Sequence, residues 1–222
     1  MPCLAEGLAL VFDLDGVIVD SNAMHVLAWR QYLESCGLGL PADYHPLIFG
    51  RRNDDIVSDL YGHGLSGAAA AAHGAAKEAV YRELMRPALS EHLVPGVRAF
   101  LERHRGAPIG LASNAERANI DLVLDSAGLR AYFRAVIDGH EVMRPKPDPE
   151  IYLGIAASLS VAPANCIVFE DSHTGVAAAR AAGARVVGVQ TTHAELAGVD
   201  LSIRDFHAPE LGQWLRAQQP SV

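Results

Sequence analysis

The sequence predicts an α/β fold in which a doubly wound parallel sheet carries a small, all-helical insert near its start. Two observations support this fold class. Short apolar runs alternate with segments of helical periodicity, an alternation typical of βαβ units and a parallel sheet. A long stretch near the start contains helical patterns but no convincing strand. We therefore expect a Rossmann-like core domain formed by residues 1–20 and 94–222, with a helical domain at residues 21–93.

Five apolar runs of four or five residues are the expected strands. Because they show no regular polar alternation, they indicate strands that are buried on both faces, as in a sheet covered by helices on each side. The runs are Leu8–Phe12, Pro108–Ala112, Ala135–Asp138, Cys166–Glu170 and Arg185–Val189.

The segments between the later runs have helical spacing. They cover residues 97–104, 115–128, 149–159 and 175–183. Two of them end in a glycine, Gly128 and Gly183, where a helix commonly ends in a left-handed residue. The alternation of these helices with the strands completes the pattern of a doubly wound sheet.

The insert contains two long helical patterns, at residues 23–37 and 67–85. The second is rich in alanine, the strongest helix former. Because the insert follows the first strand directly, we expect it to lie over the carboxyl edge of the sheet.

Composition and charge exclude several classes of protein. The 222 residues carry a formal net charge of −8, which gives no basic surface for nucleic acid or an anionic membrane. The three cysteines are widely spaced, which argues against a disulfide framework or a zinc cluster. No apolar run approaches a membrane span, and the start of the chain lacks the basic segment of a signal peptide. We therefore expect a cytoplasmic protein, of undetermined oligomeric state, that binds neither nucleic acid nor membrane.

Four carboxylates stand where two of the expected strands end. Asp13 and Asp15 follow the first strand, and Glu170 and Asp171 follow the fourth. Residues i and i+2 of an extended chain point to the same side, so both aspartates can face a site while Leu14 packs. Ligands of an open parallel sheet bind beyond the carboxyl ends of its strands. Carboxylates that converge there need a cation, and Mg²⁺ takes such oxygen ligands together with substrate phosphate.

Other polar residues at this edge could bind phosphate. The second strand ends at Ser113 and Asn114, and Lys146 lies in the loop RPKPDP. Pro145 and Pro147 restrict the backbone on both sides of this lysine. A hydroxyl group and an ammonium group beside a metal ion would bind and neutralise a phosphate group.

Each of these features also has a purely structural explanation. Ser113 and Glu116 could form a capping box, in which the serine caps a helix and the glutamate reaches back. Asp148 could cap the helix that begins with Pro149. Asp171 could likewise cap the helix that follows it. The sequence leaves these alternatives open.

Four motifs together resemble those of the haloacid dehalogenase superfamily. They are DLDGVIVDS at residues 13–21, ASN at 112–114, RPKPDPEIY at 144–152 and FEDSHTGVAAARAAG at 169–183. They stand in the order of the signature motifs of that superfamily, and the resemblance covers roughly residues 8–190. It implies a core of the haloacid dehalogenase type, with the insert as a helical cap.

The resemblance also implies a role for each motif residue. Asp13 would be the nucleophile that forms an aspartyl-phosphate, and Asp15 would be the general acid and base. The residues implied for phosphate binding are Ser113, Asn114 and Lys146. The groups implied for Mg²⁺ are Asp13, the backbone carbonyl of Asp15 and Asp171, with Glu170 as a ligand or as a partner of the ligands.

Within the superfamily, Asp15 favours a phosphate ester as the substrate, because an alkoxide leaving group needs a proton. The insert matches the cap of the phosphatase and phosphoglucomutase branch. We expect a phosphatase that hydrolyses a small phosphorylated metabolite resembling a sugar phosphate. The alternative is β-phosphoglucomutase-like transfer between sugar phosphates. A remote third possibility, a non-catalytic phosphate-binding module, would predict the loss of Asp13, Asp15 or Lys146, and all three are retained.

The insert offers several candidate substrate contacts. His25 and Trp29 are four residues apart and would share one helical face, which could point into the cleft or pack against the core. A mutase carries an arginine in its cap loop, and alignment on Gly50 puts Asn53 at that position, which favours the phosphatase; a shift in register would let Arg52 serve there instead. Arg51 and Arg52 could face the substrate or the solvent. The full set of candidates is His25, Trp29, Arg51, Arg52, Asn53 and Lys77.

Overall fold

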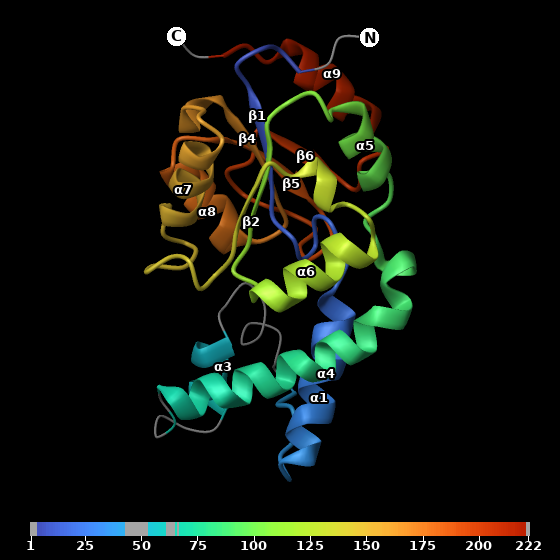
Figure 1. Cartoon of the computed structure of the whole chain (residues 1–222), viewed down its shortest axis with the longest axis vertical. Coiled ribbons are helices and arrows are strands. Elements are labelled where there is room, and N and C mark those ends of the chain that lie inside the picture. Colours follow the sequence, from blue (N-terminus) through green and yellow to red (C-terminus); the bar gives the residue numbers. More distant parts are fainter. Residues whose placement is uncertain (1–3, 43–52, 61–64, 66, 221–222) are drawn as a thin grey trace.

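Six parallel strands form the sheet at the centre of the molecule (Figure 1), in the order β3-β2-β1-β4-β5-β6. The computed structural model describes residues 4–42, 53–60, 65 and 67–220. The strands are β1 (Ala9–Phe12), β2 (Ile109–Ala112), β3 (Ala135–Ile137), β4 (Cys166–Glu170), β5 (Arg185–Val189) and β6 (Leu201–Ile203). The five predicted strands and the parallel fold class are confirmed.

The sixth strand was not predicted. β6 has three residues, Leu201, Ser202 and Ile203, and lies at the edge of the sheet, where it pairs with β5. Its exposed serine interrupts the apolar run, so the segment lacks the pattern of a strand buried on both faces. The prediction for the helix ends is confirmed, since Gly128 and Gly183 both have positive φ, at 63° and 84°.

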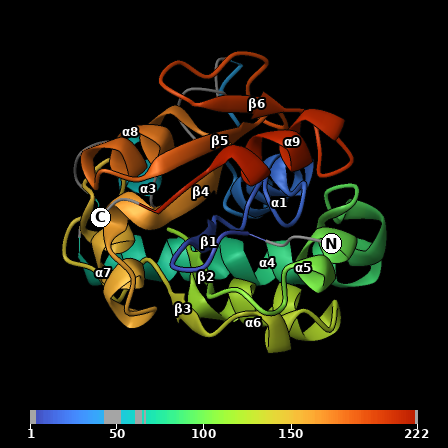
Figure 2. The same cartoon turned by 90° about the horizontal axis from the view of Figure 1, so that it is seen from above.

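The strand β1 contributes side chains to both hydrophobic cores. Leu10 and Phe12 belong to a core that includes side chains of α5, α6 and α9, whereas Ala9 and Val11 belong to a core that includes side chains of α7 and α8. Figure 2 shows α7 and α8 on one side of the sheet and α5 and α6 on the other. The helices are α5 (Val97–Arg103), α6 (Arg117–Ser126), α7 (Glu150–Ser158), α8 (His173–Ala181) and α9 (Pro209–Ala217).

The insert contributes three helices among its described residues and no strand of the sheet. Its helices are α1 (Asn22–Ser35), α3 (Asn53–Leu60) and α4 (Ala68–His92). They share a small core that includes Trp29, Leu33 and Val57. The helices lie beyond one end of the sheet (Figure 1), as expected for an insert that covers the carboxyl edge. Within the described ranges, no helix is long and apolar enough to cross a membrane.

The chain passes between core and insert at two neighbouring points. The amide of Asp20 donates to the carbonyl of His92 (2.7 Å), and the amide of Val94 donates to the carbonyl of Ile18 (3.0 Å). The long helix α4 belongs to both parts, because Tyr81 and its following turns pack into the larger hydrophobic core. Division of the chain at residues 21 and 93 remains a prediction.

Candidate active site

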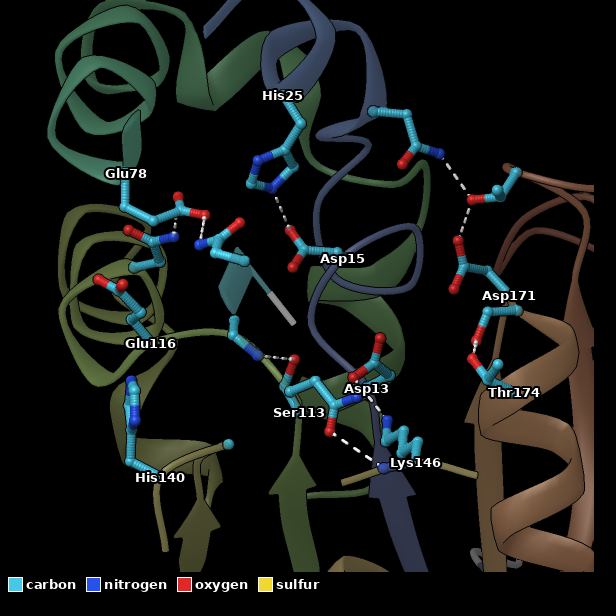
Figure 3. Close-up of a pocket in the computed structure, with 18 of the residues that line it drawn as sticks. Asp13, Asp15, His25, Glu78, Ser113, Glu116, His140, Lys146, Asp171 and Thr174 are labelled. Atoms are coloured by element: carbon cyan, nitrogen blue, oxygen red, sulfur yellow. Dashed lines mark hydrogen bonds and ion pairs between the residues drawn. The ribbon is translucent and has the colours of Figure 1, made fainter. Parts of the chain in front are cut away.

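A pocket opens where β1, β2 and β4 end, between the sheet and the helical insert (Figure 3). From the core it is lined by Asp13, Asp15, Ser113, Asn114, Ala115, Glu116, Asn119, Gly139, His140, Lys146, Asp171, Ser172, Thr174 and Thr192. From the insert it is lined by Asn22, His25, Asn53, Lys77 and Glu78. The strand-end residues predicted from the sequence therefore meet in one place, except that Glu170 lies behind the pocket wall.

Asp13 and Asp15 both line the pocket, while Leu14 between them is fully buried in the hydrophobic core. The turn that follows depends on Gly16, whose φ is 71°. A side chain at Gly16 would also collide with Asp171, because an ideal Cβ there would lie 1.8 Å from its Oδ2 atom. The tight turn therefore brings the first strand end against the carboxylate that follows the fourth strand.

Lys146 is a buried cation between two carboxylates. Its Nζ atom donates to Asp13 Oδ1 (2.9 Å), to Glu170 Oε1 (2.6 Å) and to the carbonyl of Ala112 (3.0 Å). Burial by itself would lower the pKa of this lysine, but the two carboxylates outweigh it and hold the pKa above its ordinary value. Lys146 is therefore positively charged at neutral pH and close to the carboxylate of Asp13.

Glu170 holds Lys146 rather than facing the pocket. Its side chain is fully buried, and Oε1 accepts hydrogen bonds from Lys146 and from the hydroxyl of Tyr152 (2.6 Å). Its Oε2 accepts from the amides of Asp171 (3.1 Å) and Ser172 (3.2 Å) and from the Ser172 hydroxyl. Of the two roles left open for Glu170, this geometry favours that of a partner which orients the ligands and the lysine.

The carboxylates of Asp13, Glu170 and Asp171 lie close enough to hold a metal ion, with one oxygen from each within 4.8 Å of the others. Burial, opposed by Lys146 and reinforced by Glu170 and Asp15, raises the pKa of Asp13 to about 7. Burial and the neighbouring carboxylates of Glu170 and Asp13 raise the pKa of Asp171 well above its ordinary value. These all-oxygen donors and their excess of negative charge suit Mg²⁺. Because Glu170 already accepts several hydrogen bonds, Asp13 and Asp171 are the side chains that would face such an ion.

Asp15 differs from these carboxylates in its partners. It accepts a hydrogen bond from the Ser21 hydroxyl (2.6 Å), and Nε2 of His25 lies 3.4 Å from the same oxygen. Partial burial would raise the pKa of Asp15, but the interactions with His25 and Ser21 outweigh it and lower that pKa. The two aspartates of one pocket thus have pKa values displaced in opposite directions, that of Asp13 upward and that of Asp15 downward.

Two of the structural alternatives are wrong. The helix after β2 begins at Arg117, with Glu116 as its N-cap and no side-chain cap, so Ser113 and Glu116 form no capping box. Instead, Ser113 accepts from the amide of Ala115 (3.2 Å) and lines the pocket. The helix after β4 is capped by Ser172, which accepts from the amide of Gly175 (3.0 Å). Asp171 is therefore not needed as a cap.

The structural explanation for Asp148 is supported. Its carboxylate accepts from the amide of Glu150 (3.0 Å), the first residue of α7, and Pro149 occupies the cap position.

Asn114 lines the pocket, and its side-chain oxygen lies 3.4 Å from the amide of Lys146. This contact ties the loop that carries the lysine to the end of β2.

The candidates in the insert separate into three groups. His25, Asn53 and Lys77 line the pocket. Trp29 does not line it, because its side chain is buried in the core of the insert with the Lys77 ammonium 5.1 Å above its ring. Its expected contact with the substrate is therefore corrected to a packing role. Arg51 and Arg52 lie outside the described residues.

Several pocket residues were missed from the sequence. Glu78 and Asn119 lie within helices, where a single polar residue carries no signal for a site. Thr192 could have been found, because it follows β5 and the carboxyl end of that strand was not considered. Its hydroxyl donates to Asp171 and accepts from the side-chain amide of Asn22 (2.6 Å). Thr192 thus connects one carboxylate of the site to the first helix of the insert.

The packing of Gly175 against Glu170 allows a sharp test of this arrangement. An ideal Cβ at Gly175 would lie 1.8 Å from Glu170 Oε1, so Gly175→Ala is expected to displace the carboxylate that holds Lys146. We expect a loss of about 1–3 kcal/mol in the free energy of unfolding, measured in urea, as for an overpacked core. Any activity that depends on the position of the Lys146 ammonium should fall about tenfold, because the carboxylate that holds it is displaced.

A matched control for this variant is Gly212→Ala in α9. An added Cβ there meets only an Arg216 nitrogen at 3.5 Å, and alanine favours a helix more than glycine does. Equal effects of the two substitutions on stability and turnover would contradict the role of Gly175.

Comparison with known proteins agrees with this geometry. The family model of haloacid dehalogenase-like hydrolases matches residues 8–183. A β-phosphoglucomutase of Bacillus subtilis (strain 168) is 32% identical over 205 residues, which are 88% of each chain. A fructose-1-phosphate phosphatase of Escherichia coli (strain K12) is 33% identical over 183 residues, which are 82% of this chain and 95% of that protein.

A solved structure extends the likeness to the whole fold. A β-phosphoglucomutase from Clostridium difficile matches with a TM-score of 0.80 at 27% identity, over 93% of this chain and 96% of that chain. The family model spans most of the sequence and includes all four motifs. The chain therefore belongs to the haloacid dehalogenase-like hydrolase family.

Proposed function

We propose that this hydrolase is a Mg²⁺-dependent phosphatase that cleaves a small, sugar-phosphate-like monoester through an aspartyl-phosphate intermediate. The observation that carries the proposal is the position of the Lys146 ammonium, which lies 2.9 Å from Asp13 in a pocket also lined by Asp15 and Ser113. A phosphatase named for fructose 1-phosphate and one named for phosphorylated carbohydrates, both at least 33% identical to this chain, support this class of substrate. The expected location is the cytoplasm.

In the first step, a carboxylate oxygen of Asp13 attacks phosphorus and the bond to the leaving oxygen breaks. Asp15 gives its proton to that oxygen, so an alcohol leaves. The approach of a phosphate anion raises the pKa of a nearby carboxyl group, which favours the protonated form of Asp15 in the complex. In the second step, Asp15 takes a proton from water, the water oxygen attacks the phosphoryl group, and Asp13 is released with inorganic phosphate.

The other residues position the phosphoryl group. Lys146 neutralises charge on Asp13 and on the phosphoryl oxygens, while the hydroxyl of Ser113 and the side chain of Asn114 offer hydrogen bonds. Asp13, Asp171 and the backbone carbonyl of Asp15 would hold Mg²⁺. When bound, the ion would supply further neutralisation of the transferring group. The helical insert, at residues 21–93, would act as a cap that excludes water during the reaction and opens for product release.

Mg²⁺ is expected to stabilise the protein more at about pH 8 than at about pH 5. The pKa of Asp13 is raised from 3.8 to about 7, so its contribution to stability is present below its ordinary pKa and is lost as the pH rises through about 7. Mg²⁺ binds the ionised carboxylates and offsets this loss, whereas at low pH it must displace protons. The measurement is the thermal unfolding midpoint with Mg²⁺ and with EDTA at each pH.

Asp171→Asn is the comparison variant for this measurement, because it removes one proposed ligand and keeps the shape of the side chain. The rise in its thermal unfolding midpoint on addition of Mg²⁺ should be smaller than the rise seen with the wild type. A Mg²⁺ shift that is absent, or that is the same at both pH values, would refute the metal site proposed here. EDTA should also stop phosphatase activity, and added Mg²⁺ should restore it.

Asp15→Asn is expected to slow cleavage of alkyl phosphates about a hundredfold, because general acid catalysis is lost. The rate at which p-nitrophenyl phosphate phosphorylates Asp13 should fall less than the rate of alkyl phosphate cleavage, since nitrophenolate leaves without a proton. The measurement is the initial burst of nitrophenol compared with turnover of a sugar phosphate. If Asp15→Asn cleaved sugar phosphates at the parent rate, Asp15 would not be the general acid.

The second candidate function is β-phosphoglucomutase-like transfer, favoured by the likeness to the Bacillus subtilis mutase over 88% of the chain. A panel of phosphorylated metabolites separates the two activities. It should include p-nitrophenyl phosphate as well as β-glucose 1-phosphate with a bisphosphate activator. Free phosphate supports the phosphatase, and isomerised sugar phosphate supports the mutase. Well-folded protein that acts on no member of the panel in the presence of Mg²⁺ would contradict both.

A further inference from the structure

One wall of the pocket is formed by residues that the four motifs do not include. Figure 3 shows Glu78, Glu116 and His140 along this wall, on the side away from Asp171. Glu78 comes from helix α4 of the insert, whereas Glu116 and His140 come from the core. This wall, Glu78 with Glu116 and His140, is called the acidic wall below.

Glu78 is a fixed and well-supported anion. Its side chain is buried, and Oε1 accepts hydrogen bonds from the side-chain amide of Asn53 (2.6 Å) and from Lys77 Nζ (2.9 Å). Oε2 accepts from the side-chain amide of Asn119 (2.7 Å). A carboxylate oxygen has two lone-pair sites, so Oε2 can accept one more hydrogen bond from a ligand hydroxyl. The contacts come from both insert and core, which fixes the carboxylate relative to the phosphate site.

The charge of Glu78 persists across the working range of pH. Burial would raise its pKa, but Lys77, His25 and the hydrogen bonds from Lys77 and Asn53 outweigh it and lower the pKa to about 2. Glu116 adds a second carboxylate to the same wall. A group that lies against this wall therefore meets the acceptor oxygens of two carboxylates, of which Glu78 is ionised and paired with Lys77.

The nearby cations already have anionic partners. Lys77 contacts Glu78, and Lys146 contacts Asp13 and Glu170. These two lysines are the only lysine or arginine side chains among the described residues that line the pocket. Behind the wall, Arg82 lies 3.6 Å from Glu116 and donates to Asn119 (2.8 Å). Among the described residues, every lysine or arginine side chain at this wall is thus already paired with a carboxylate, and the imidazole of His140 is the remaining basic group there.

We propose that Glu78 is a specificity-determining residue that selects monoesters with an uncharged, hydroxyl-bearing leaving group and discriminates against bisphosphates and phosphorylated carboxylic acids. The inference rests on the proposed phosphatase function and narrows its substrate class. A hydroxyl group donates to Glu78, whereas an anion is repelled by it. Because a mutase cycle must hold a sugar bisphosphate, the same wall disfavours the mutase. Arg51 and Arg52 lie outside the described residues, and any attraction they exert on an anion would appear in the substrate comparison below.

The first experiment compares two pairs of substrates with the wild-type protein and Mg²⁺. Glycerol phosphate and phosphoglycerate differ by a hydroxymethyl group in place of a carboxylate, and fructose 1-phosphate and fructose 1,6-bisphosphate differ by one phosphate. We expect kcat/KM to favour the uncharged member of each pair by at least about tenfold, because like charges in a site are strongly disfavoured. Equal or reversed preference in both pairs would overturn the proposal.

The second experiment changes the charge of the wall. Glu78→Gln keeps the shape and one acceptor oxygen but removes the charge, so the preference within each pair should fall to about threefold or less. Glu83→Gln is the matched control, because Glu83 is exposed on the same helix, and its ratios should equal those of the wild type. If Glu78→Gln does not fold, Glu116→Gln tests the same wall. An undiminished preference in every folded wall variant would overturn the proposal.

The substrate ratios also separate this inference from the proposed function. If the wild type hydrolyses p-nitrophenyl phosphate but shows no preference within the pairs, the inference fails and the phosphatase function stands. If the wild type hydrolyses no monoester, the phosphatase function fails and the inference falls with it.

Discussion

Replacement of Asp13 by asparagine is expected to reduce turnover of every phosphate monoester by at least about ten-thousandfold, because the attacking group is lost. The fold should remain intact. Burial and the neighbouring carboxylates raise the pKa of Asp13 to about 7, so at about pH 8 the site in the absence of metal favours a neutral side chain over the ionised one. EDTA-treated Asp13→Asn should therefore unfold at a temperature no lower than that of the EDTA-treated wild type at that pH.

The control for this variant is Asp20→Asn. Asp20 lies in the same segment, its side chain is exposed and it does not line the pocket, so the same change in charge is made outside the site. Its turnover should match that of the wild type. Steady hydrolysis by Asp13→Asn, in protein shown by mass spectrometry to be free of deamidation, would exclude Asp13 as the nucleophile. Mass spectrometry after reaction with substrate should likewise detect phosphorylation only when Asp13 is present.

The strands and the strand-end residues could be predicted because their signals are local. Leu8–Phe12 is a continuous apolar run, and the acids that follow it must leave the core at the edge of a parallel sheet. The same reasoning places Ser113 and Lys146 in the pocket, as the structure does. β6 escaped prediction because the exposed Ser202 interrupts its apolar run.

The acidic wall could not be predicted, because its geometry depends on contacts between distant segments. Glu78 and Asn119 are 41 residues apart and come from different helices, yet their side chains are 2.7 Å apart. Helical periodicity shows which side chains share a face but not which helix that face meets. For this reason the pair His25 and Trp29 was resolved only by the structure, with His25 in the pocket and Trp29 in the core of the insert.

The local signals at the helix starts were ambiguous for a physical reason. A serine or an aspartate before a helix can accept from a backbone amide or can face a ligand, and both uses favour the same residue types. At α8 the structure assigns the cap to Ser172, which leaves the neighbouring Asp171 for the pocket. At α7 it gives Asp148 a contact with the first helical amide. Side-chain direction, which decides the use, is set by packing.

Lys146→Met is expected to lower turnover by about a thousandfold and to destabilise the protein by about 3–5 kcal/mol at about pH 8. Methionine keeps most of the length and the apolar stem of lysine, so the main loss is the charge. In the wild type the Lys146 Nζ atom lies 2.9 Å from Asp13 Oδ1 and 2.6 Å from Glu170 Oε1. Without the ammonium group, these two buried carboxylates would lie side by side with no cation between them. The measurement is urea unfolding in EDTA together with steady-state hydrolysis in Mg²⁺.

The pH dependence distinguishes this loss of charge from a simple packing defect. Loss of the cation raises the pKa of Asp13 further in the folded protein, so the stability that depends on its protonated form is lost as the pH rises. Destabilisation by Lys146→Met should therefore be larger at about pH 8 than at about pH 5, whereas a cavity would cost the same at both. Arg144→Met is the matched control, because this exposed cation lies in the same loop and, within the described part of the chain, pairs with the half-buried carboxylates of Asp148 and Glu150. Exposed pairs contribute about 0–1 kcal/mol. A pH-independent loss in Lys146→Met, or an equal loss in Arg144→Met, would mean that the charge of Lys146 does not stabilise the ionised form of Asp13.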